Sequence, residues 1–497
     1  MLFNSYTFIL VFLPIVIGGF YVFSRTGNHR FMVTFLTFSS VVFYGWWNPK
    51  YLLLILASIL VNFFISRKIQ PDRATSRQWL WLGIAFNLGL LGYFKYANFF
   101  VDVAASVSGM PWHISGIVLP LAISFFTFQQ IAYLVDTFRG DGTDQSFMEY
   151  CLFVTFFPQL IAGPIVHHRE MMPQFKDPQR FRFTASNLGL GLSVFFAGLF
   201  KKVIIADSMA LYATPVFQAA ETGAPIGLID GWGAALSYTF QLYFDFSGYT
   251  DMATGLALMF GIRLPVNFLS PYKATSIIDF WRRWHMTLSR FLRDYLYIPL
   301  GGNRQGQGRR MANLMVTMVL GGLWHGAGWT FVLWGALHGI YLMINTLWRT
   351  ILQRAEITLF EGPVGRGLGR LITFLAIVAA WVLFRAESLD GAANVLAGMA
   401  GAHGLHVPPV LAELKWDEAY RRIALLLAIV WLAPNTVEIF ATGTADPSTS
   451  PAVSRSSPSR FSLIWRPNRR CAYALALIAV AALANMTEIS EFLYFRF

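Results

Sequence analysis

The chain has 497 residues, of which 56% are hydrophobic and only 13% are charged, and its formal net charge is +12. Soluble domains carry about a quarter charged residues, so this composition excludes an ordinary soluble enzyme. Lipid tolerates only helices or closed barrels, and the apolar runs are too long and uniform for barrel strands, which leaves an all-α, polytopic membrane protein.

The first apolar segment, in MLFNSYTFILVFLPIVIGGFYVFSRTGNHR, has no basic residue before its apolar core. A cleavable signal peptide has the opposite charge order and a small-residue cleavage site. We therefore predict a retained first span, with the N-terminus in the periplasm and Arg25 in the cytoplasm.

Further apolar runs recur along the whole chain, and a span needs about 20 such residues. The sequence predicts roughly a dozen spans within one membrane domain over residues 1–497, with no internal repeat and no soluble second domain. The predicted spans are 6–24, 31–47, 51–66, 79–94, 117–138, 147–165, 186–206, 230–260 (one or two), 312–323, 329–348, 371–385, 420–440 and 471–485.

Basic loops separate several of these spans, at 66–77, 167–182 and 301–310. The positive-inside rule places such loops in the cytoplasm, and it explains the net positive charge without nucleic acid. Residues 442–460, TGTADPSTSPAVSRSSPSR from 442 on, are rich in Ser and Pro and predict a flexible loop.

Several common catalytic signatures are missing from the sequence. It has no G-x-S-x-G elbow, no Walker A loop and no H-E-x-x-H zinc motif, so hydrolase, ATPase and metalloprotease functions lack support. Cys151 and Cys471 stand alone in apolar runs and predict neither a disulfide framework nor a thiolate metal site. We expect no metal site.

The segment FFPQLIAGPIVHHREMMPQF (156–175) combines helix breakers with His167 and His168. It is either a re-entrant element that lines a cavity or a span that ends in a cytoplasmic loop. Farther along the chain, Asp245 and Asp251 interrupt an apolar run, where they either pair with arginine or line a polar path.

The segment SIIDFWRRWHMTLSRFLRDYLYIPLGG (276–302) is predicted to be an amphipathic helix at the cytoplasmic face. Trp281 and His285 share its apolar face at helical spacing. Arg282 and Arg293 lie on another side, where they either anchor the helix to lipid headgroups or hold an anionic cytosolic donor.

One charged pair within this segment is also predicted. Asp279 and Arg283 stand four residues apart, so they can form an ion pair on one side of a helix.

The stretch LGGLWHGAGWTFVLWGALHG (320–339) places His325 among closely spaced glycines. Glycines weaken a helix interior and allow a broken helix that lines a cavity, with Trp324 and Trp329 as its walls. A neutral imidazole there can take a proton from an attacking hydroxyl and return one to a leaving group. The alternative is a histidine that only bonds a neighbouring helix.

His338 lies thirteen residues after His325. In a straight helix this separation is ~20 Å along the axis and roughly 220° around it. We therefore expect His338 to be a structural polar group between helices, away from the reaction centre.

Two of these stretches, DFWRRWHMTLSRFLRDYLYIPLGGNR and LGGLWHGAGWTFVLWGALHG, together resemble the membrane-bound O-acyltransferase (MBOAT) superfamily. Within it, the chain is similar to the membrane subunit of bacterial alginate O-acetylation. The resemblance covers residues 1–350 strongly and continues in WVLFRAESL (381–389).

The resemblance implies a helical bundle with a central tunnel or funnel. It assigns the catalytic histidine to His325 and the second site of the family to His285, with Arg282, Arg293, Trp281, Trp324 and Trp329 as expected substrate contacts.

The resemblance further implies an inner-membrane O-acetyltransferase for an exported polysaccharide, with alginate as the first choice. The donor is acetyl-CoA or another acetyl thioester, no cofactor is bound permanently, and the partners are periplasmic acetyltransferase proteins and membrane lipid. Two alternatives stay open: acylation of cellulose, peptidoglycan or teichoic acid, and a transporter or flippase, which helix breaks and intramembrane aspartates allow.

Overall fold

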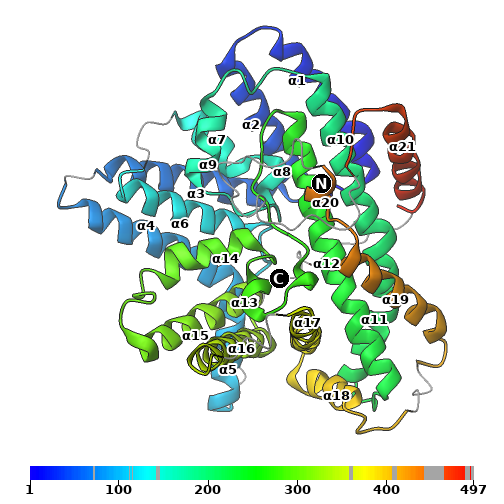
Figure 1. Cartoon of the computed structure of the whole chain (residues 1–497). Helices are drawn as coiled ribbons and strands as arrows, with labels where there is room; N and C mark the ends of the chain where they lie inside the picture. The colour runs from blue at the N-terminus through cyan, green and yellow to red at the C-terminus, as the bar shows by residue number, and fades with distance from the viewer. Residues whose placement is uncertain are drawn as a thin grey trace.

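The computed structural model describes residues 1–497 except 71–72, 111, 113, 115, 142–145, 357–361, 406–410, 441–463, 487–492 and 494–497. The described residues form helices and no strand (Figure 1), which confirms the all-α prediction. The predicted flexible loop at 442–460 lies outside the described residues.

The described helices follow one another along the chain. Their bounds are η1 Thr7–Phe12, α1 Leu13–Ser24, α2 His29–Gly45, α3 Pro49–Lys68, α4 Ser76–Leu91, η2 Gly92–Tyr96, α5 Ala97–Ser108, α6 Ile123–Phe138, α7 Phe147–Thr155, α8 Phe157–Leu160, α9 His168–Lys176, α10 Ala185–Phe200, η3 Lys201–Ala206, α11 Asp207–Glu221, α12 Leu228–Met259, η4 Pro271–Lys273, α13 Ile277–Trp281, α14 Met286–Leu292, η5 Arg293–Tyr297, α15 Gly306–His325, α16 Trp329–Arg354, α17 Pro363–Arg385, α18 Leu389–Met399, α19 Trp416–Leu432, α20 Thr436–Ile439 and α21 Arg469–Ala484.

Five of the described helical stretches are long and apolar enough to cross a membrane: Thr7–Ser24, Pro49–Lys68, Ala185–Glu221, Trp329–Arg354 and Pro363–Arg385. At most half of each apolar window is buried inside the protein, so the remaining side chains are available to lipid. The chain is therefore an integral membrane protein. The prediction of roughly a dozen spans stays a prediction.

One predicted span is broken in the structure, and the open alternative for another is decided. The run 147–165 is broken, because α7 ends at Thr155, α8 is a single turn, and the chain then leaves the helix at the Gly163–Pro164 pair. The run 230–260 is the single 32-residue helix α12, which is almost wholly buried.

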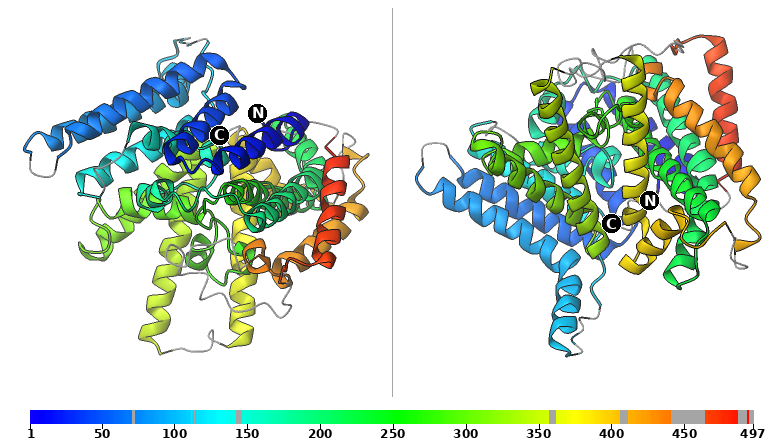
Figure 2. Two further views of the ribbon diagram at one scale, coloured as in Figure 1. Left: turned by 90° about the horizontal axis from the view of Figure 1, so that it is seen from above. Right: turned by 60° about the horizontal axis from the view of Figure 1, so that its bottom comes forward.

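Helix α12 forms the centre of the fold, and α10, α11, α17, α18 and α19 pack against it (Figures 1 and 2). It meets α10 through two glycine pairs. A Cβ on Gly198 would lie 2.5 Å from the carbonyl oxygen of Gly248, and a Cβ on Gly191 would lie 2.6 Å from that of Gly255. Only glycine permits backbones to approach this closely, as at other membrane helix contacts.

Asp245 and Asp251 of α12 both pair with lysines of η3. Lys202 Nζ lies 2.7 Å from Asp245 Oδ1, with both side chains 2% exposed, and Lys201 Nζ lies 2.6 Å from Asp251 Oδ2. Of the two alternatives that the sequence left open for these aspartates, the structure shows ion pairing, and the partners are lysines rather than arginines. Asp245 also accepts a hydrogen bond of 3.0 Å from the backbone N–H of Leu493, which holds that residue against α12.

We expect Lys202→Met to lower the free energy of unfolding by ~3–5 kcal/mol, because it leaves the Asp245 carboxylate buried without its ammonium partner. The measurement is denaturant unfolding of the purified protein in mild detergent. Arg421→Ala is the matched control, because the Arg421–Asp417 pair is more than 70% exposed on both sides and such pairs contribute at most about 1 kcal/mol. Equal losses in the two variants would contradict a special role for the buried pair.

Candidate functional site

The glycine-rich stretch around His325 forms a helical hairpin. Helix α15 ends at His325, residues 326–328 are non-helical, and α16 begins at Trp329. The two helices pack closely, because a Cβ on Gly322 would lie 3.1 Å from the Cα of Gly335. The predicted helix break is therefore confirmed.

The same turn corrects the predicted separation between His338 and His325. That prediction assumed one straight helix, which would carry His338 far from His325. Because the chain reverses at 326–328, α16 runs back along α15 and both imidazoles contact the indole of Trp334, at ring-centroid distances of 5.3 Å for His325 and 4.7 Å for His338.

His325 is buried among aromatic rings at the end of α15. Its ring centroid lies 5.0 Å from that of Trp324 and 5.2 Å from that of Phe384 on α17. His285 is 6.2 Å away and fully buried. The structure thus brings together the two histidines that the sequence singled out, which lie forty residues apart.

The end of α15 is held by η2, an element that the sequence reading missed. Lys95 Nζ donates to the carbonyl oxygen of Trp324 at 2.5 Å and to that of His325 at 3.3 Å, and Tyr96 Oη donates to that of Leu323 at 2.9 Å. A cation at a helix C-terminus also interacts favourably with the helix dipole. The sequence feature that could have indicated this contact is the single lysine in the apolar run GLLGYFKYANFF.

The segment around His285 is not the continuous helix that we predicted over 276–302. It consists of α13, α14 and η5, and His285 separates the first two with a left-handed backbone, φ 42°. The helical spacing still places the Asp279–Arg283 pair correctly, at 2.9 Å. His285 is nevertheless fully buried in the protein core.

Asn267 holds the ring of His285. The His285 Nδ1 lies 3.1 Å from Asn267 Oδ1, which also accepts a 2.9 Å hydrogen bond from the hydroxyl of Thr287. Because a carboxamide oxygen only accepts, Nδ1 carries the proton and Nε2 has the lone pair. Burial lowers the pKa of His285 to about 3, so the ring is neutral at physiological pH.

His338 has the opposite tautomer. The Trp281 Nε1–H donates to His338 Nδ1 at 3.2 Å, so Nδ1 is the acceptor and Nε2 carries the proton. A ring in this state has no second lone pair with which to accept a proton. This geometry agrees with the structural role expected for His338.

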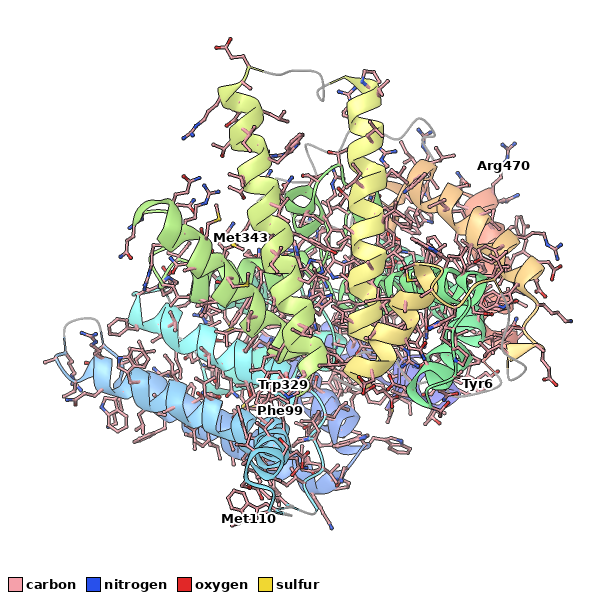
Figure 3. All side chains as sticks on the ribbon, turned by 90° about the horizontal axis from the view of Figure 1, so that it is seen from below. Tyr6, Phe99, Met110, Trp329, Met343 and Arg470 are labelled. Atoms are coloured by element: carbon pink, nitrogen blue, oxygen red, sulfur yellow. The ribbon has the colours of Figure 1, made fainter. Side chains whose placement is uncertain are left out.

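The predicted tryptophans fall into two groups. Trp324 is buried beside His325, and Trp281 bonds His338. Trp329 is 53% exposed and packs on Phe99, with ring centroids 5.7 Å apart, so it does not wall the histidine site (Figure 3).

The two predicted arginines lie at the protein surface. Arg282 is exposed, and the 61% exposed side chain of Arg293 pairs with Asp294 at 2.7 Å. The structure does not bring either guanidinium to His325 in any described contact.

His167 and His168 are buried beside this segment rather than exposed in a loop. The ring nitrogen His167 Nδ1 lies 3.1 Å from the hydroxyl of Tyr295, which donates to Asp136 at 2.8 Å. Burial lowers the pKa of His167 to about 3. These hydrogen bonds join the start of α9 to η5 and α6 and form a packing network.

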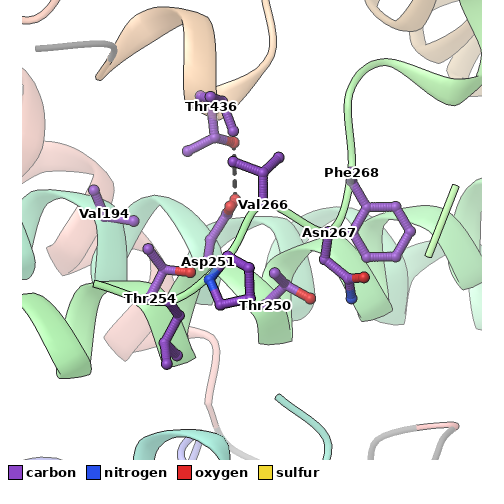
Figure 4. A pocket seen from close by; sticks show the side chains of 11 residues that line it. Val194, Thr250, Asp251, Thr254, Val266, Asn267, Phe268 and Thr436 are labelled. Carbon is purple, nitrogen blue, oxygen red and sulfur yellow. Dashed lines mark hydrogen bonds between the residues drawn. The ribbon is translucent and has the colours of Figure 1, made fainter. Parts of the chain in front are cut away.

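A small cavity lies on the far side of Asn267, between Asp251 and Phe268 (Figure 4). Its volume is about 30 Å³, and Asp251 accepts a 2.8 Å hydrogen bond from Thr436 at its edge. This space suits a single water molecule. It therefore cannot hold an acyl donor.

Comparisons with known proteins agree with this arrangement. Residues 139–384 match the family model described as MBOAT, membrane-bound O-acyltransferase family. The chain is 46% identical to the peptidoglycan O-acetyltransferase of Helicobacter pylori, over 82% of this chain and 81% of that protein.

Two further relatives are less similar to this chain. The probable alginate O-acetylase AlgI of Pseudomonas putida is 38% identical over the whole length of both chains. The teichoic acid D-alanyltransferase of Streptococcus thermophilus is 27% identical, over 53% of this chain and 68% of that protein. The chain therefore belongs to the membrane-bound O-acyltransferase family and is an acyltransferase.

Proposed function

We propose that this acyltransferase moves an acetyl group from a cytosolic thioester, acetyl-CoA, through the inner membrane for the O-acetylation of an exported envelope polysaccharide. The observation that carries the proposal is the burial of His325 and His285 side by side, 6.2 Å apart, at the end of a broken helix. The relatives named O-acetyltransferase or O-acetylase support the choice of acetyl.

In the proposed reaction, neutral His325 is the general base. It accepts the proton of the acceptor hydroxyl while the hydroxyl oxygen bonds the thioester carbonyl carbon. The C–S bond then breaks, and the imidazolium returns the proton to the thiolate. The acetyl group passes directly to the acceptor, and no acyl-enzyme forms.

His285 supports this proton transfer from the opposite wall. The Nδ1–H of His285 donates to Asn267. Its Nε2, which carries the lone pair, is therefore the nitrogen that can accept or relay a proton. Such a fixed tautomer is typical of functional histidines whose second nitrogen is oriented by a neighbour. The exposed Arg282 and Arg293 would contact the anionic groups of the donor at the protein surface.

Alginate is our first choice of polymer, because the match with a probable alginate O-acetylase spans both chains completely. Peptidoglycan is the second candidate, because the relative with that activity is the more identical, at 46%. Periplasmic acetyltransferase proteins would then carry the acetyl group to the polymer.

The test is complementation in two host strains, one without its own alginate acetylation subunit and one without its own peptidoglycan O-acetyltransferase. We expect the chain to restore ester-linked acetate on alginate in the first strain, measured after mild alkaline release. Restoration only in the second strain would assign peptidoglycan, and restoration in neither, with the protein present in the membrane, would contradict the proposal.

His325→Gln should lower acetyl transfer by about 10²–10⁴-fold, because glutamine cannot take the proton that a general base accepts. His285→Ala should fall between this variant and the parent. His338→Gln should keep most activity, since a carboxamide oxygen can still accept the Trp281 N–H. Transfer is compared at matched membrane abundance, and an active His325→Gln with an inactive His338→Gln would place the chemistry on the other imidazole.

Lys95→Met should reduce acetyl transfer although the side chain does not reach the proposed reacting atoms. The variant leaves the carbonyls of Trp324 and His325 without their hydrogen-bond donor. Each unsatisfied buried carbonyl destabilises this arrangement by about 1–3 kcal/mol, so the end of α15 shifts. Lys95→Arg, which keeps a cationic donor, should retain more activity than Lys95→Met. The control is Lys68→Met at the exposed end of α3; a full-activity Lys95→Met would refute the positioning role.

The orientation in the membrane is also part of the proposal. The basic segments 66–77, 167–182 and 301–310 should face the cytoplasm, where the thioester is made. The short turn before α3 should then face the periplasm, because one span separates it from Arg25.

Single cysteines at exposed positions test this orientation. In a Cys471→Ser background, Thr75→Cys, Gln179→Cys and Gln307→Cys should resist a membrane-impermeant thiol reagent in intact cells and react after permeabilisation. Lys50→Cys should react in intact cells and is the positive control. Labelling of position 307 in intact cells would overturn the cytoplasmic route for the donor.

A further inference from the structure

A deep cleft separates the arginine-bearing ends of α16 and α17. Its volume is about 920 Å³, and it is lined by one face of each helix together with the start of α13. Figures 2 and 3 show the two helices running side by side and projecting from the rest of the bundle. The cleft is distinct from the histidine site.

The walls of the cleft are apolar along most of their length. On α16, Tyr341, Ile344 and Trp348 recur at three- and four-residue spacing and therefore share one face. On α17, Leu368 and Ile372 face the same space. Ile372 is 65% exposed and Ile344 is 59% exposed, and both lie in candidate spans, so these side chains require an apolar occupant in the membrane.

The charges of the cleft gather at one end. Arg349 and Arg366 line it from opposite helices, with Glu356 as the acidic residue among them. Arg349 lies eight residues from Tyr341, or ~12 Å along the helix. The cleft thus combines a cationic mouth with an apolar shaft.

The inner end of the cleft is closed. Tyr341 contacts His338 at 5.8 Å between ring centroids, and behind it Trp334 stacks on Trp381 at 5.8 Å and 16°. Trp334 then separates His338 from His325. The cleft therefore does not open onto the proposed reaction centre, and its occupant need not be the donor or the acceptor.

We propose that this cleft binds one anionic phospholipid, with its phosphate between Arg349 and Arg366 and an acyl chain along Ile344, Trp348 and Ile372. Paired guanidinium groups bind phosphate by charge-assisted hydrogen bonds, and basic pockets between membrane helices bind anionic headgroups. The bound lipid fills the wedge between α16 and α17, whose inner ends carry the stacked pair Trp334 and Trp381.

The test measures retained lipid directly and does not depend on acetyl transfer. The full chain is placed in bilayer discs of equal phosphatidylglycerol and phosphatidylcholine, and the lipid that remains bound is read by native mass spectrometry. We expect the parent to retain phosphatidylglycerol preferentially. The Arg349→Ala/Arg366→Ala double variant should retain it at least about tenfold less, since it removes both guanidinium groups that bind the phosphate.

Arg354→Ala is the matched control, because Arg354 ends the same helix and is exposed without lining the cleft; it should retain lipid like the parent. Equal retention by the double variant, or equal retention of both lipids by the parent, would overturn the proposal. Loss of phosphatidylglycerol on addition of acetyl-CoA would also overturn it, by assigning the arginines to the phosphates of the donor.

A second pair of variants tests the apolar shaft. Ile372→Trp should obstruct the acyl-chain path along the cleft and reduce lipid retention, whereas Leu371→Trp, on an exposed part of α17 outside the cleft lining, should not. Retention by Ile372→Trp equal to that of Leu371→Trp would place the lipid elsewhere. Because these readouts need no acetyl transfer, the lipid site and the proposed function can fail separately.

Discussion

A helix that ends inside a membrane protein leaves four backbone carbonyls that lipid cannot satisfy. At the C-terminus of α15, each of these four carbonyls accepts a hydrogen bond. Gly322 O accepts from the N–H of Gly326, and the other three carbonyls accept from Tyr96 and Lys95 of η2. The position of His325 therefore depends on a π-helical segment 230 residues earlier in the chain, and such segments are frequent at functional sites.

The opposite wall of the site satisfies the same constraint by other means. His285 adopts a left-handed backbone between two short helices, and Asn267 compensates by binding both its ring and the N–H and hydroxyl of Thr287. Asn267 in turn follows the buried helix α12, whose place is fixed by its glycine contacts and lysine pairs with α10 and η3. Local strain at one residue is thus supported by contacts that lead back to the buried, closely packed helix α12.

Features governed by short-range pattern could be predicted from the sequence. Apolar runs gave the helices, the glycine cluster gave the break after His325, and i,i+4 spacing gave the Asp279–Arg283 pair. Two of the failures, at 276–302 and at Trp329, depended on distant partners. The segment 276–302 breaks because the core accepts His285, and Trp329 faces outward because α5 offers it Phe99. Periodicity within one segment contains no information about such partners.

The contrast between His285 and His338 shows why residue type alone does not identify a catalytic group. Both imidazoles are fully buried, and burial keeps His285 neutral. Their neighbours differ: Asn267 presents an acceptor to His285, whereas Trp281 presents a donor to His338. The Asn267 oxygen leaves the lone pair of His285 on Nε2, whereas the Trp281 N–H occupies the lone pair on Nδ1 of His338. In the proposed reaction, the ability to move a proton is therefore set by the partner of each ring, and the His338–Trp281 pair acts as a fixed wall that keeps Trp334 against His325.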